Sequence, residues 1–381
     1  MKIAISARTL SGQPRDGIAW FTFEFISRMV RNHPEHTFFL ISDKRYQKPP
    51  FVLHNAQFIH LAPRNRHPII TVLWHQMLLK HLLRRLKVDI FIGPDGVIPL
   101  RCSIPCISVI HDLNHVHRPD DIPFFSRHFY RYYFPRYAKS ATRIATVSKF
   151  SADDISAVYD IKPYKIDVVY NGVSGMFFPT SEAEADDYRN SLTGGKPYFV
   201  FVSNFSPRKN VGTLIKAFDR FRSESGSDYA LVLAGGRLYL NDELDRAVNE
   251  SPYKDSIIFT GRMDREELRK AYGAALAFVF IPWFEGFGIP VIEAMRCGTP
   301  CIVSDNSSLP EVSGGAALCV NAADTEACAR AMIRIANEPA LRRILRDKGI
   351  KNSLRFSWDD TAIQMYNSVL NALDPNAYTI F

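Results

Sequence analysis

Two carboxylates, Glu285 and Glu293, bracket a glycine-containing segment that could bind a phosphorylated sugar. The apolar run 277–282 comes just before it and predicts a buried strand. Pro290 suits the first turn of a helix, where its missing N–H is not needed, and residues 291–295 continue with helical apolar spacing. The prediction is a strand, a glycine loop and a helix, with Glu285 in the loop and Glu293 about two helical turns later.

The loop and the start of this helix could hold an anion. A helix N-terminus presents backbone N–H groups and the positive end of the helix dipole, and both favour a phosphate. The two carboxylates would then accept hydrogen bonds from hydroxyl groups, so the pattern indicates a nucleotide-linked sugar. An ordinary strand–helix turn with two solvated acids would have the same spacing, and spacing alone does not separate the two interpretations.

The same stretch resembles the E-x7-E signature of family 4 of the retaining glycosyltransferases, which have the GT-B fold. Segments 298–305 and 309–312 also match that family's pattern, and the resemblance covers nearly the whole chain, most sharply 203–311. It implies that Glu285 holds the hydroxyls of the donor sugar and that Glu293 accepts hydrogen bonds from the ribose. It also assigns nucleotide binding to the loop residues Gly286, Phe287, Gly288 and Ile289.

Two adjacent cations, Arg208 and Lys209, follow the predicted strand 198–203. Arginine through its planar fork and lysine as a point charge can neutralise a diphosphate, although a charge pair before a helix is more often simply solvated. The Pro-Arg-Lys-Asn sequence resembles the family's phosphate-binding segment, which implies that both cations stabilise charge on the leaving diphosphate. Many members carry a further arginine where Asn204 stands, and Arg208 could supply that charge instead.

A third segment of the second half ends the predicted strand 257–262. Asp264 is expected to cap the next helix, with Glu267 completing a capping box. The resemblance places the equivalent of this strand's end near the nucleobase. It therefore assigns nucleotide binding to Gly261, Arg262 and Met263.

The first half contributes two candidates, Gly17 and His111. A turn-rich stretch, 11–17, opens a helix and could seat a pyrophosphate or be a plain surface loop; neither a G-x-G-x-x-G nor a Walker pattern is present. Gly17 resembles part of the family's glycine-rich loop, with Asp16 in place of the usual second glycine. His111 ends the predicted strand 104–110 and resembles the active-site histidine of the family, which implies contact with the donor sugar.

The neighbouring histidines raise one alternative for the first half. His111, His115 and His117 could suggest a metal cluster, but no carboxylate or thiol spacing of a familiar zinc site accompanies them.

Composition narrows the class of protein. Hydrophobic residues at 46% and charged residues at 23% describe a globular chain, and no apolar run is long enough to span a membrane. The net charge of +8 favours anionic partners, but no nucleic-acid-binding motif accompanies it, so we expect no nucleic acid. The chain enters a strand pattern at once and its six cysteines show no C-x-x-C spacing, so we expect no signal peptide and reduced core cysteines in a cytoplasmic protein.

Aromatic and basic residues interleave over 118–143. A helix of this kind can lie on an anionic membrane surface, so peripheral association with the inner face of the membrane is one interpretation. The same pattern fits a helix with a core-facing stripe and a solvated face.

Strand and helix patterns alternate along the chain and predict parallel sheets with crossover helices. The resemblance gives this the GT-B form: two Rossmann-like, doubly wound α/β domains facing a cleft. We predict an acceptor-side domain over 1–173, a linker over 174–196 and a nucleotide-sugar domain over 197–357. A terminal helix within 358–381 is expected to return to the first domain, although its pattern also fits a helix on the second.

The resulting prediction is a retaining glycosyltransferase that acts on a glycan or lipid-linked glycan in cell-surface polysaccharide synthesis. GDP-mannose is the favoured donor, because the sequence resembles bacterial O-antigen and capsule mannosyltransferases; UDP-sugars are the alternative. No metal or other cofactor is expected, because there is no D-x-D pair and the cations could replace a divalent ion. A nucleotide-sugar epimerase and a non-catalytic nucleotide-sugar-binding module remain as other interpretations.

Overall fold

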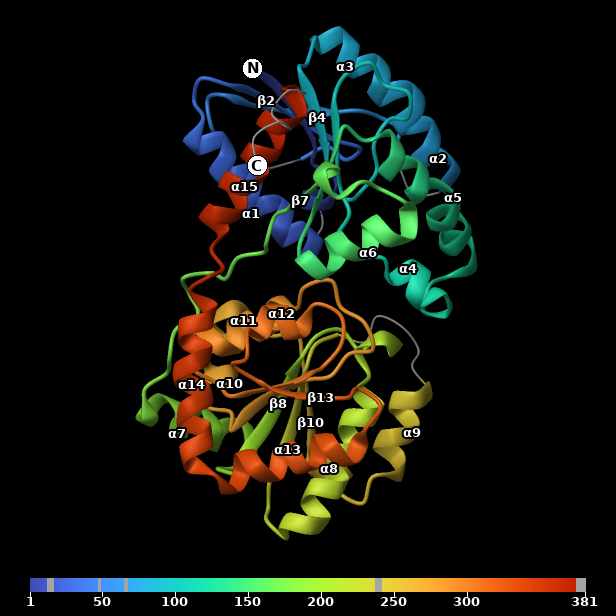
Figure 1. The fold of residues 1–381 in the computed structure, drawn as a ribbon. Helices are drawn as coiled ribbons and strands as arrows, with labels where there is room; N and C mark the ends of the chain where they lie inside the picture. The colour runs from blue at the N-terminus through green and yellow to red at the C-terminus, as the bar shows by residue number, and fades with distance from the viewer. Residues whose placement is uncertain (12–16, 47–48, 65–67, 237–241, 375–381) are drawn as a thin grey trace. The chain divides into compact units, whose positions relative to one another are not determined.

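The chain folds into two compact units, shown in Figure 1, a computed structural model. The structure describes residues 1–11, 17–46, 49–64, 68–236 and 242–374. Unit 1 comprises Met1–Gly172 and Trp358–Phe381, and unit 2 comprises Val173–Ser357. Each unit is built around its own parallel sheet.

Unit 1 contains a seven-stranded sheet in the order β3-β2-β1-β4-β5-β6-β7, with every neighbouring pair parallel. The central strands are mostly apolar and buried, as in β4, where all four residues are buried, because helices cover both faces of such a sheet. The edge strand β3 has only partly buried and exposed residues and lacks this signal, and we did not predict it. The strands are β1 (Lys2–Ser6), β2 (Thr37–Ser42), β3 (Ala56–His60), β4 (Ile90–Gly93), β5 (Cys106–Val109), β6 (Arg143–Thr146) and β7 (Ile166–Val168).

The helices of unit 1 include one irregular segment. Residues 68–86 form one continuous helical segment, but its middle part, η2, is π-helical. The helical elements are η1 (Arg8–Ser11), α1 (Gly17–Asn32), α2 (Pro68–Leu73), η2 (Trp74–Leu79), α3 (Lys80–Leu86), α4 (Asn114–His117), η3 (Pro119–Asp121), α5 (Phe124–Ser140), α6 (Lys149–Tyr159), η4 (Pro163–Lys165) and α15 (Trp358–Leu373).

The terminal helix α15 packs on α1, within unit 1. Its apolar face is buried through Trp358, Met365 and Val369. The Arg28 guanidinium of α1 donates to Asp359 at 2.7 Å, which adds a polar contact at the rim. The chain thus returns to the sheet in which it began.

Unit 2 contains a six-stranded parallel sheet in the order β10-β9-β8-β11-β12-β13. Its strands are β8 (Tyr198–Val202), β9 (Ala230–Ala234), β10 (Ile257–Gly261), β11 (Ala277–Phe280), β12 (Cys301–Ser304) and β13 (Leu318–Val320). Its helical elements are α7 (Glu182–Thr193), η5 (Pro207–Lys209), α8 (Val211–Ser225), α9 (Asp242–Glu250), η6 (Lys254–Ser256), α10 (Arg265–Gly273), α11 (Ile289–Arg296), α12 (Leu309–Ser313), α13 (Thr325–Asn337) and α14 (Pro339–Ser353).

The strand order of unit 2 reverses between β8 and β11, where Ala277 pairs with Phe199. In open parallel sheets, ligands bind beyond the carboxyl ends of the strands at such a switch point. The segments that follow β8 and β11 are the two that carry the predicted cations and Glu285. The topology therefore brings these two segments to one place.

The segment 174–196, which we predicted to be a linker, instead belongs to unit 2 and contains α7. The Ser181 side chain accepts from the Glu184 backbone N–H at the start of α7, and the Arg269 guanidinium forms an ion pair with the Glu184 carboxylate. We predicted a linker because this segment is polar and acidic. These polar residues lie on the exposed faces of α7, which belongs to unit 2 and buries only Ala185 and Thr193.

The cysteines are free thiols, and four of the six are buried, as expected for reduced core residues. Cys102 is partly buried, and Cys319 is exposed, which differs from the prediction for that residue. No helix among residues 1–11, 17–46, 49–64, 68–236 and 242–374 is long and apolar enough to cross a membrane.

Candidate active site

The segments after β8 and β11 contact each other directly at the switch point of unit 2. Pro207–Lys209 form the short helix η5, and the backbone N–H of Trp283 donates to the Arg208 carbonyl at 2.9 Å. Asn210 adopts a left-handed conformation with φ 58°, and its buried side chain donates to the Ile281 carbonyl at 2.9 Å and the Ala322 carbonyl at 2.8 Å. These bonds lock the cation-bearing turn against the end of β11.

Glu285 lies between the two predicted cations. Arg208 Nη1 is 3.0 Å from Glu285 Oε2, and Lys209 Nζ forms an ion pair with the same oxygen. The Lys209 side chain is only 6% exposed and that of Glu285 15%, and the Lys209 ammonium lies 5.0 Å from the centre of the Phe280 ring. Burial opposes the charged form, but the two cations outweigh it and hold the pKa of Glu285 below its usual value. Glu285 is therefore a carboxylate at neutral pH.

The glycine loop continues from Glu285 to α11 and is tightly constrained. Gly288 has φ 95°, and a Cβ there would lie 2.7 Å from a Leu309 methyl carbon, so both conformation and space require glycine. Ser307 Oγ accepts from the Glu285 N–H at 3.1 Å, and Ser308 Oγ donates to the Glu285 carbonyl at 2.8 Å. The loop is thus held from the segment after β12, a support that the sequence pattern did not reveal.

Helix α11 begins at Ile289, with Pro290 in its first turn, as predicted within one residue. Its first N–H groups have no partner within the helix, because a helix leaves its initial donors unpaired internally. Together with Gly286, Phe287 and Gly288, this end of α11 is where the sequence predicts that an anion binds.

Glu293 lies on α11 in a different environment from Glu285. The Tyr272 hydroxyl donates to its Oε2 atom at 3.3 Å. Burial raises the pKa of Glu293 to about 7, although Arg265 and the bond from Tyr272 oppose this rise. At neutral pH the group is poised between its two charge states, whereas Glu285 is fully ionised.

Gly261, Arg262 and Met263 lie at the end of β10, where the chain is partly or fully exposed. Gly235, which follows β9, donates its N–H to the Gly261 carbonyl at 2.7 Å. A Cβ on Gly235 would come within 1.7 Å of the Ser203 carbonyl oxygen after β8. Gly235 therefore lets the ends of three strands meet at one edge of the sheet, a role we did not predict.

The unit 1 candidates occupy the equivalent edge of their own sheet. His111 Nε2 lies 2.9 Å from the Pro94 carbonyl after β4, and its ring packs edge-on against Phe21 at 5.0 Å. Gly17 is the first residue of α1 and is exposed, but residues 12–16 of the predicted loop lie outside the described residues.

The other two histidines of the discarded metal interpretation have separate partners. His115 Nε2 contacts the Tyr159 hydroxyl at 2.7 Å, whereas His117 Nε2 lies 2.9 Å from Asp154. They do not converge on one point with His111 in the described structure.

A buried polar cluster at the same edge of unit 1 was not predicted. Arg8, just after β1, lies 3.4 Å from both Asp95 and the His75 ring nitrogen Nε2. Burial and the Arg8 charge lower the pKa of His75 to about 4. Arg8 also lies 4.0 Å from Asp43. Asp43 and Asp95 come just after the buried strands β2 and β4, a position that the sequence could have revealed, whereas the π-helical turn that carries His75 left no such signal.

The two parallel-sheet α/β units have the GT-B fold, which solved glycosyltransferases share. Residues 15–174 match the model of Glycosyltransferase Family 4, and residues 167–352 match that of Glycosyl transferases group 1. Both models describe glycosyltransferases, and the chain belongs to glycosyltransferase family 4, group 1.

Known proteins agree with this assignment. The O-antigen chain mannosyltransferase B of Escherichia coli is 29% identical over 290 residues, which are 75% of each chain. Sucrose-phosphate synthase from Thermosynechococcus elongatus superposes with a TM-score of 0.77 at 20% identity, over 98% of this chain and 100% of that one. Anabaena HepE, solved with UDP-glucose, gives a TM-score of 0.74 at 16% identity, over 97% and 100%. The last two similarities concern the fold alone.

Proposed function

We propose that the protein transfers mannose from GDP-mannose to a hydroxyl of a glycan or lipid-linked glycan in cell-surface polysaccharide synthesis, with retention of anomeric configuration. The observation that carries the proposal is the Glu285 carboxylate held between Lys209 and Arg208 at the switch point of unit 2. The similarity to an O-antigen mannosyltransferase supports mannose as the sugar. A UDP-sugar donor is the second candidate, because HepE, which shares the fold, was solved with UDP-glucose.

The site supplies the parts that departure of a diphosphate requires. Arg208 and Lys209 would move part of their interaction from Glu285 to the diphosphate as negative charge grows on the leaving oxygen. The first turn of α11 would add backbone donors. These fixed positive charges take the role that a divalent ion has in other transferases, so we expect transfer to need no metal.

Glu285 suits orientation better than nucleophilic attack. Both cations interact with one of its oxygens, which reduces its nucleophilicity and leaves it a strong hydrogen-bond acceptor for sugar hydroxyls. Retention without a covalent intermediate requires attack from the face of the leaving group, with the departing phosphate taking the acceptor proton. The resemblance to the family implies that His111 contacts the donor sugar.

Thermal unfolding with GDP, UDP, dTDP and CDP tests the donor site. A nucleotide that binds only the native state should add ~2.7 kcal/mol of stability at ~100 times its dissociation constant. We expect a rise with GDP alone, unchanged by Mg²⁺. A rise in stability with UDP alone would make a UDP-sugar the favoured donor in place of GDP-mannose. No rise with any nucleotide would contradict the proposed donor site.

Donor turnover with and without a glycan acceptor then separates the remaining interpretations. A transferase consumes donor in step with acceptor. An epimerase would convert donor without acceptor, and a binding module would bind nucleotide without consuming donor in either case.

The raised pKa of Glu293 predicts a pH-dependent nucleotide affinity. Ribose hydroxyls donate best to the ionised carboxylate, and a group with a pKa of about 7 is about 90% protonated at pH 6 and about 10% at pH 8. We expect GDP to bind about tenfold more tightly at pH 8 than at pH 6. The variant Glu293→Gln should lose this contribution while keeping the titration of the nucleotide phosphate. Calorimetric titration of both proteins measures it; the same pH dependence in both would contradict the assignment.

We also propose that α5 contacts an anionic membrane surface at the inner face. The helix buries Phe134, Tyr137 and Ala138, so one side is a core-facing stripe, as one interpretation of the sequence required. On the other side Phe124, Phe125 and Tyr132 are 64%, 78% and 53% exposed. The arginines Arg131 and Arg136 are also exposed.

Replacing Arg131 and Arg136 with Glu should weaken binding to anionic vesicles. Each basic residue near such a surface contributes ~1 kcal/mol, so losing two should cost roughly 30-fold in partitioning. Vesicle sedimentation with and without phosphatidylserine measures the effect. The pair Arg330→Glu and Arg334→Glu, on the exposed side of α13, is the control; equal losses in both pairs, or none, would contradict the proposal.

A further inference from the structure

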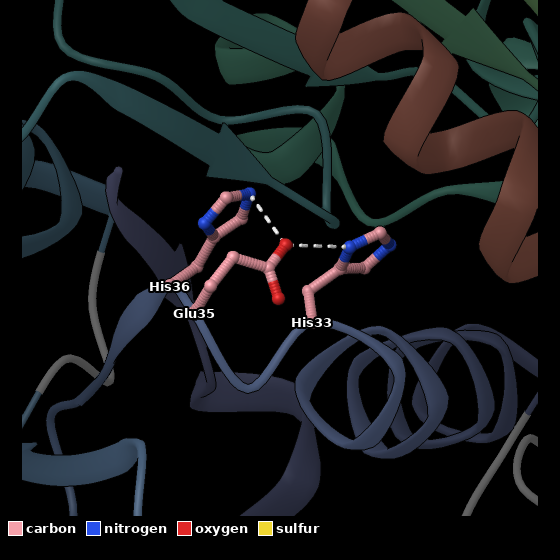
Figure 2. A group of neighbouring side chains, drawn as sticks. All are labelled: His33, Glu35 and His36. Carbon is pink, nitrogen blue, oxygen red and sulfur yellow. Dashed lines mark hydrogen bonds and ion pairs between the residues drawn. The ribbon is translucent and has the colours of Figure 1, made fainter.

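Three side chains of types that bind metals, His33, Glu35 and His36, come together in the turn between α1 and β2 (Figure 2). His33 Nδ1 lies 3.2 Å from Glu35 Oε1, and His36 Nε2 lies 3.4 Å from the same oxygen. The three ligand atoms all lie within 4.8 Å of one another. No sequence motif marks this His-Pro-Glu-His stretch as a site.

We propose that His33, Glu35 and His36 bind one Zn²⁺ ion. Zinc is bound by imidazole nitrogen and carboxylate oxygen at ~2.0–2.1 Å, so adjacent ligands of a tetrahedral ion lie ~3.3 Å apart. The two nitrogen–oxygen separations match that value, and the two nitrogens lie within 4.8 Å of each other. An ion bound to His36 Nε2 would replace the 2.8 Å hydrogen bond between this nitrogen and the Tyr366 hydroxyl. Two imidazoles and one carboxylate form a ligand set that zinc accepts, and water can complete the coordination.

The backbone holds these ligands in place before any ion arrives. The His36 N–H donates to the His33 carbonyl at 3.2 Å and closes the turn. The buried Asn55 side chain donates to the His33 carbonyl at 3.0 Å and to the Val30 carbonyl at 2.9 Å. The following residue, Thr37, is tied into the sheet by a 2.9 Å bond from its N–H to the Met1 carbonyl. A preorganised turn lowers the ordering cost of binding.

The surroundings also suit a zinc site. The Tyr366 ring of α15 stacks on His33 at 3.7 Å, and its hydroxyl lies 2.8 Å from His36 Nε2, where it could hydrogen-bond to a zinc-bound water. The Met1 ammonium lies 3.4 Å from His36 Nδ1 and would have to move away from the N–H that Nδ1 carries when Nε2 binds zinc.

Access to the site is open. The His36 and His33 side chains are 10% and 23% exposed, and that of Glu35 is 56% exposed. An ion can therefore enter from solution, with the two imidazoles forming the floor of the site and the carboxylate its outer ligand.

The location indicates a structural rather than a catalytic role. The turn precedes β2 and so lies at the amino ends of the unit 1 strands, whereas His111 follows β5 at their carboxyl ends. An ion held there would brace the α1–β2 turn beneath Tyr366 of α15. The proposal does not depend on the proposed transferase function, and Zn²⁺ should alter stability without altering sugar transfer.

The test uses the full chain without a histidine tag, treated with EDTA and then freed of chelator. Calorimetric titration with ZnCl₂ should give one ion per chain, and Co²⁺ should give the visible absorption of a tetrahedral complex. Zn²⁺ should also raise the midpoint of thermal unfolding. Each of His33→Gln and Glu35→Gln should weaken Zn²⁺ binding at least about tenfold and remove the thermal shift.

The matched control is His60→Gln, which removes an exposed imidazole from the edge strand β3 of the same unit. It should bind Zn²⁺ like the wild type. The proposal is overturned if the wild type shows no saturable Zn²⁺ binding, if the two ligand variants bind as tightly as the wild type, or if His60→Gln loses as much affinity as they do. Glu35→Gln keeps size at an exposed position, so its result does not depend on misfolding.

Discussion

Glu285→Gln is expected to lower sugar transfer about a hundredfold while GDP binding stays the same or tightens. Glutamine keeps the size of the side chain but replaces an ionised acceptor with a neutral one, and a hydrogen bond to a charged group is worth ~1.5–3 kcal/mol. Glutamine still accepts a neutral hydrogen bond, worth ~0.5–1.5 kcal/mol, so each of two such bonds would lose about 1.4 kcal/mol and the two together a factor of about a hundred in kcat. Lys209 and Arg208, no longer neutralised by Glu285, would keep their full charge for the diphosphate.

Initial rates with saturating donor and acceptor measure the first effect, and calorimetric titration with GDP measures the second. Glu326→Gln on α13 is the control, because Glu326 is an exposed carboxylate that also pairs with an arginine, Arg220, at 3.4 Å. Wild-type transfer by Glu285→Gln would remove this residue from the site. A parallel loss of GDP binding would show that Glu285 organises the phosphate site rather than the sugar.

Much of this site follows from local sequence, because strands and the residues that end them leave local signals. The run before Glu285 is apolar on both faces, which is typical of a central parallel strand, and β11 is fully buried. Gly288 and Pro290 predict the loop-to-helix transition, and α11 begins one residue before Pro290. The carboxyl-end positions of the cations and of His111 follow from the same strand pattern.

What the sequence does not contain is the contact between segments far apart in the chain. Arg208 and Glu285 are separated by 77 residues, and only the pairing of β8 with β11 brings them together. As a consequence, the sequence predicted two phosphate-binding cations and a sugar-binding carboxylate but not that they are ion-paired. The opposite pKa shifts of Glu285 and Glu293 likewise depend on burial and neighbours, which spacing does not encode.

The errors have equally local causes. The segment 174–196 is polar and acidic, and composition favoured a linker, but the Ser181-to-Glu184 spacing is a capping-box signal for the helix that forms there. Strand β3 was missed because an edge strand is buried on fewer sides and its alternation is weak. In both cases few residues of the element are buried, so the overall composition of the segment did not reveal the helix or the strand.

Lys209→Met is expected to lower kcat/KM about 10²–10³-fold, the cost typical of removing one preorganised group that stabilises charge in a transition state. It should also weaken GDP binding, since the ammonium is the more buried of the two cations, at 6% exposure against 23% for Arg208. Methionine keeps the length and packing of the side chain against Phe280. Initial rates and GDP titration measure these losses.

The same substitution should destabilise the fold, because it leaves Glu285 with one cation instead of two. Removing one partner of a buried ion pair costs ~3–5 kcal/mol, and the remaining contact with Arg208 should keep the loss at or below the lower end of that range. The free energy of unfolding in urea measures it. The double variant Lys209→Met with Glu285→Gln removes both charges, so it should recover most of this stability.

This double variant separates structure from chemistry. If Lys209 acts on the leaving diphosphate, the recovered stability should bring back no transfer, and the double-mutant cycle should show coupling in unfolding without rescue of kcat. If Lys209 served only to hold Glu285 in place, Lys209→Met would cost no more transfer than Glu285→Gln does, and GDP would bind to it as to the wild type. That outcome would leave Arg208 and the first turn of α11 as the groups that stabilise the diphosphate.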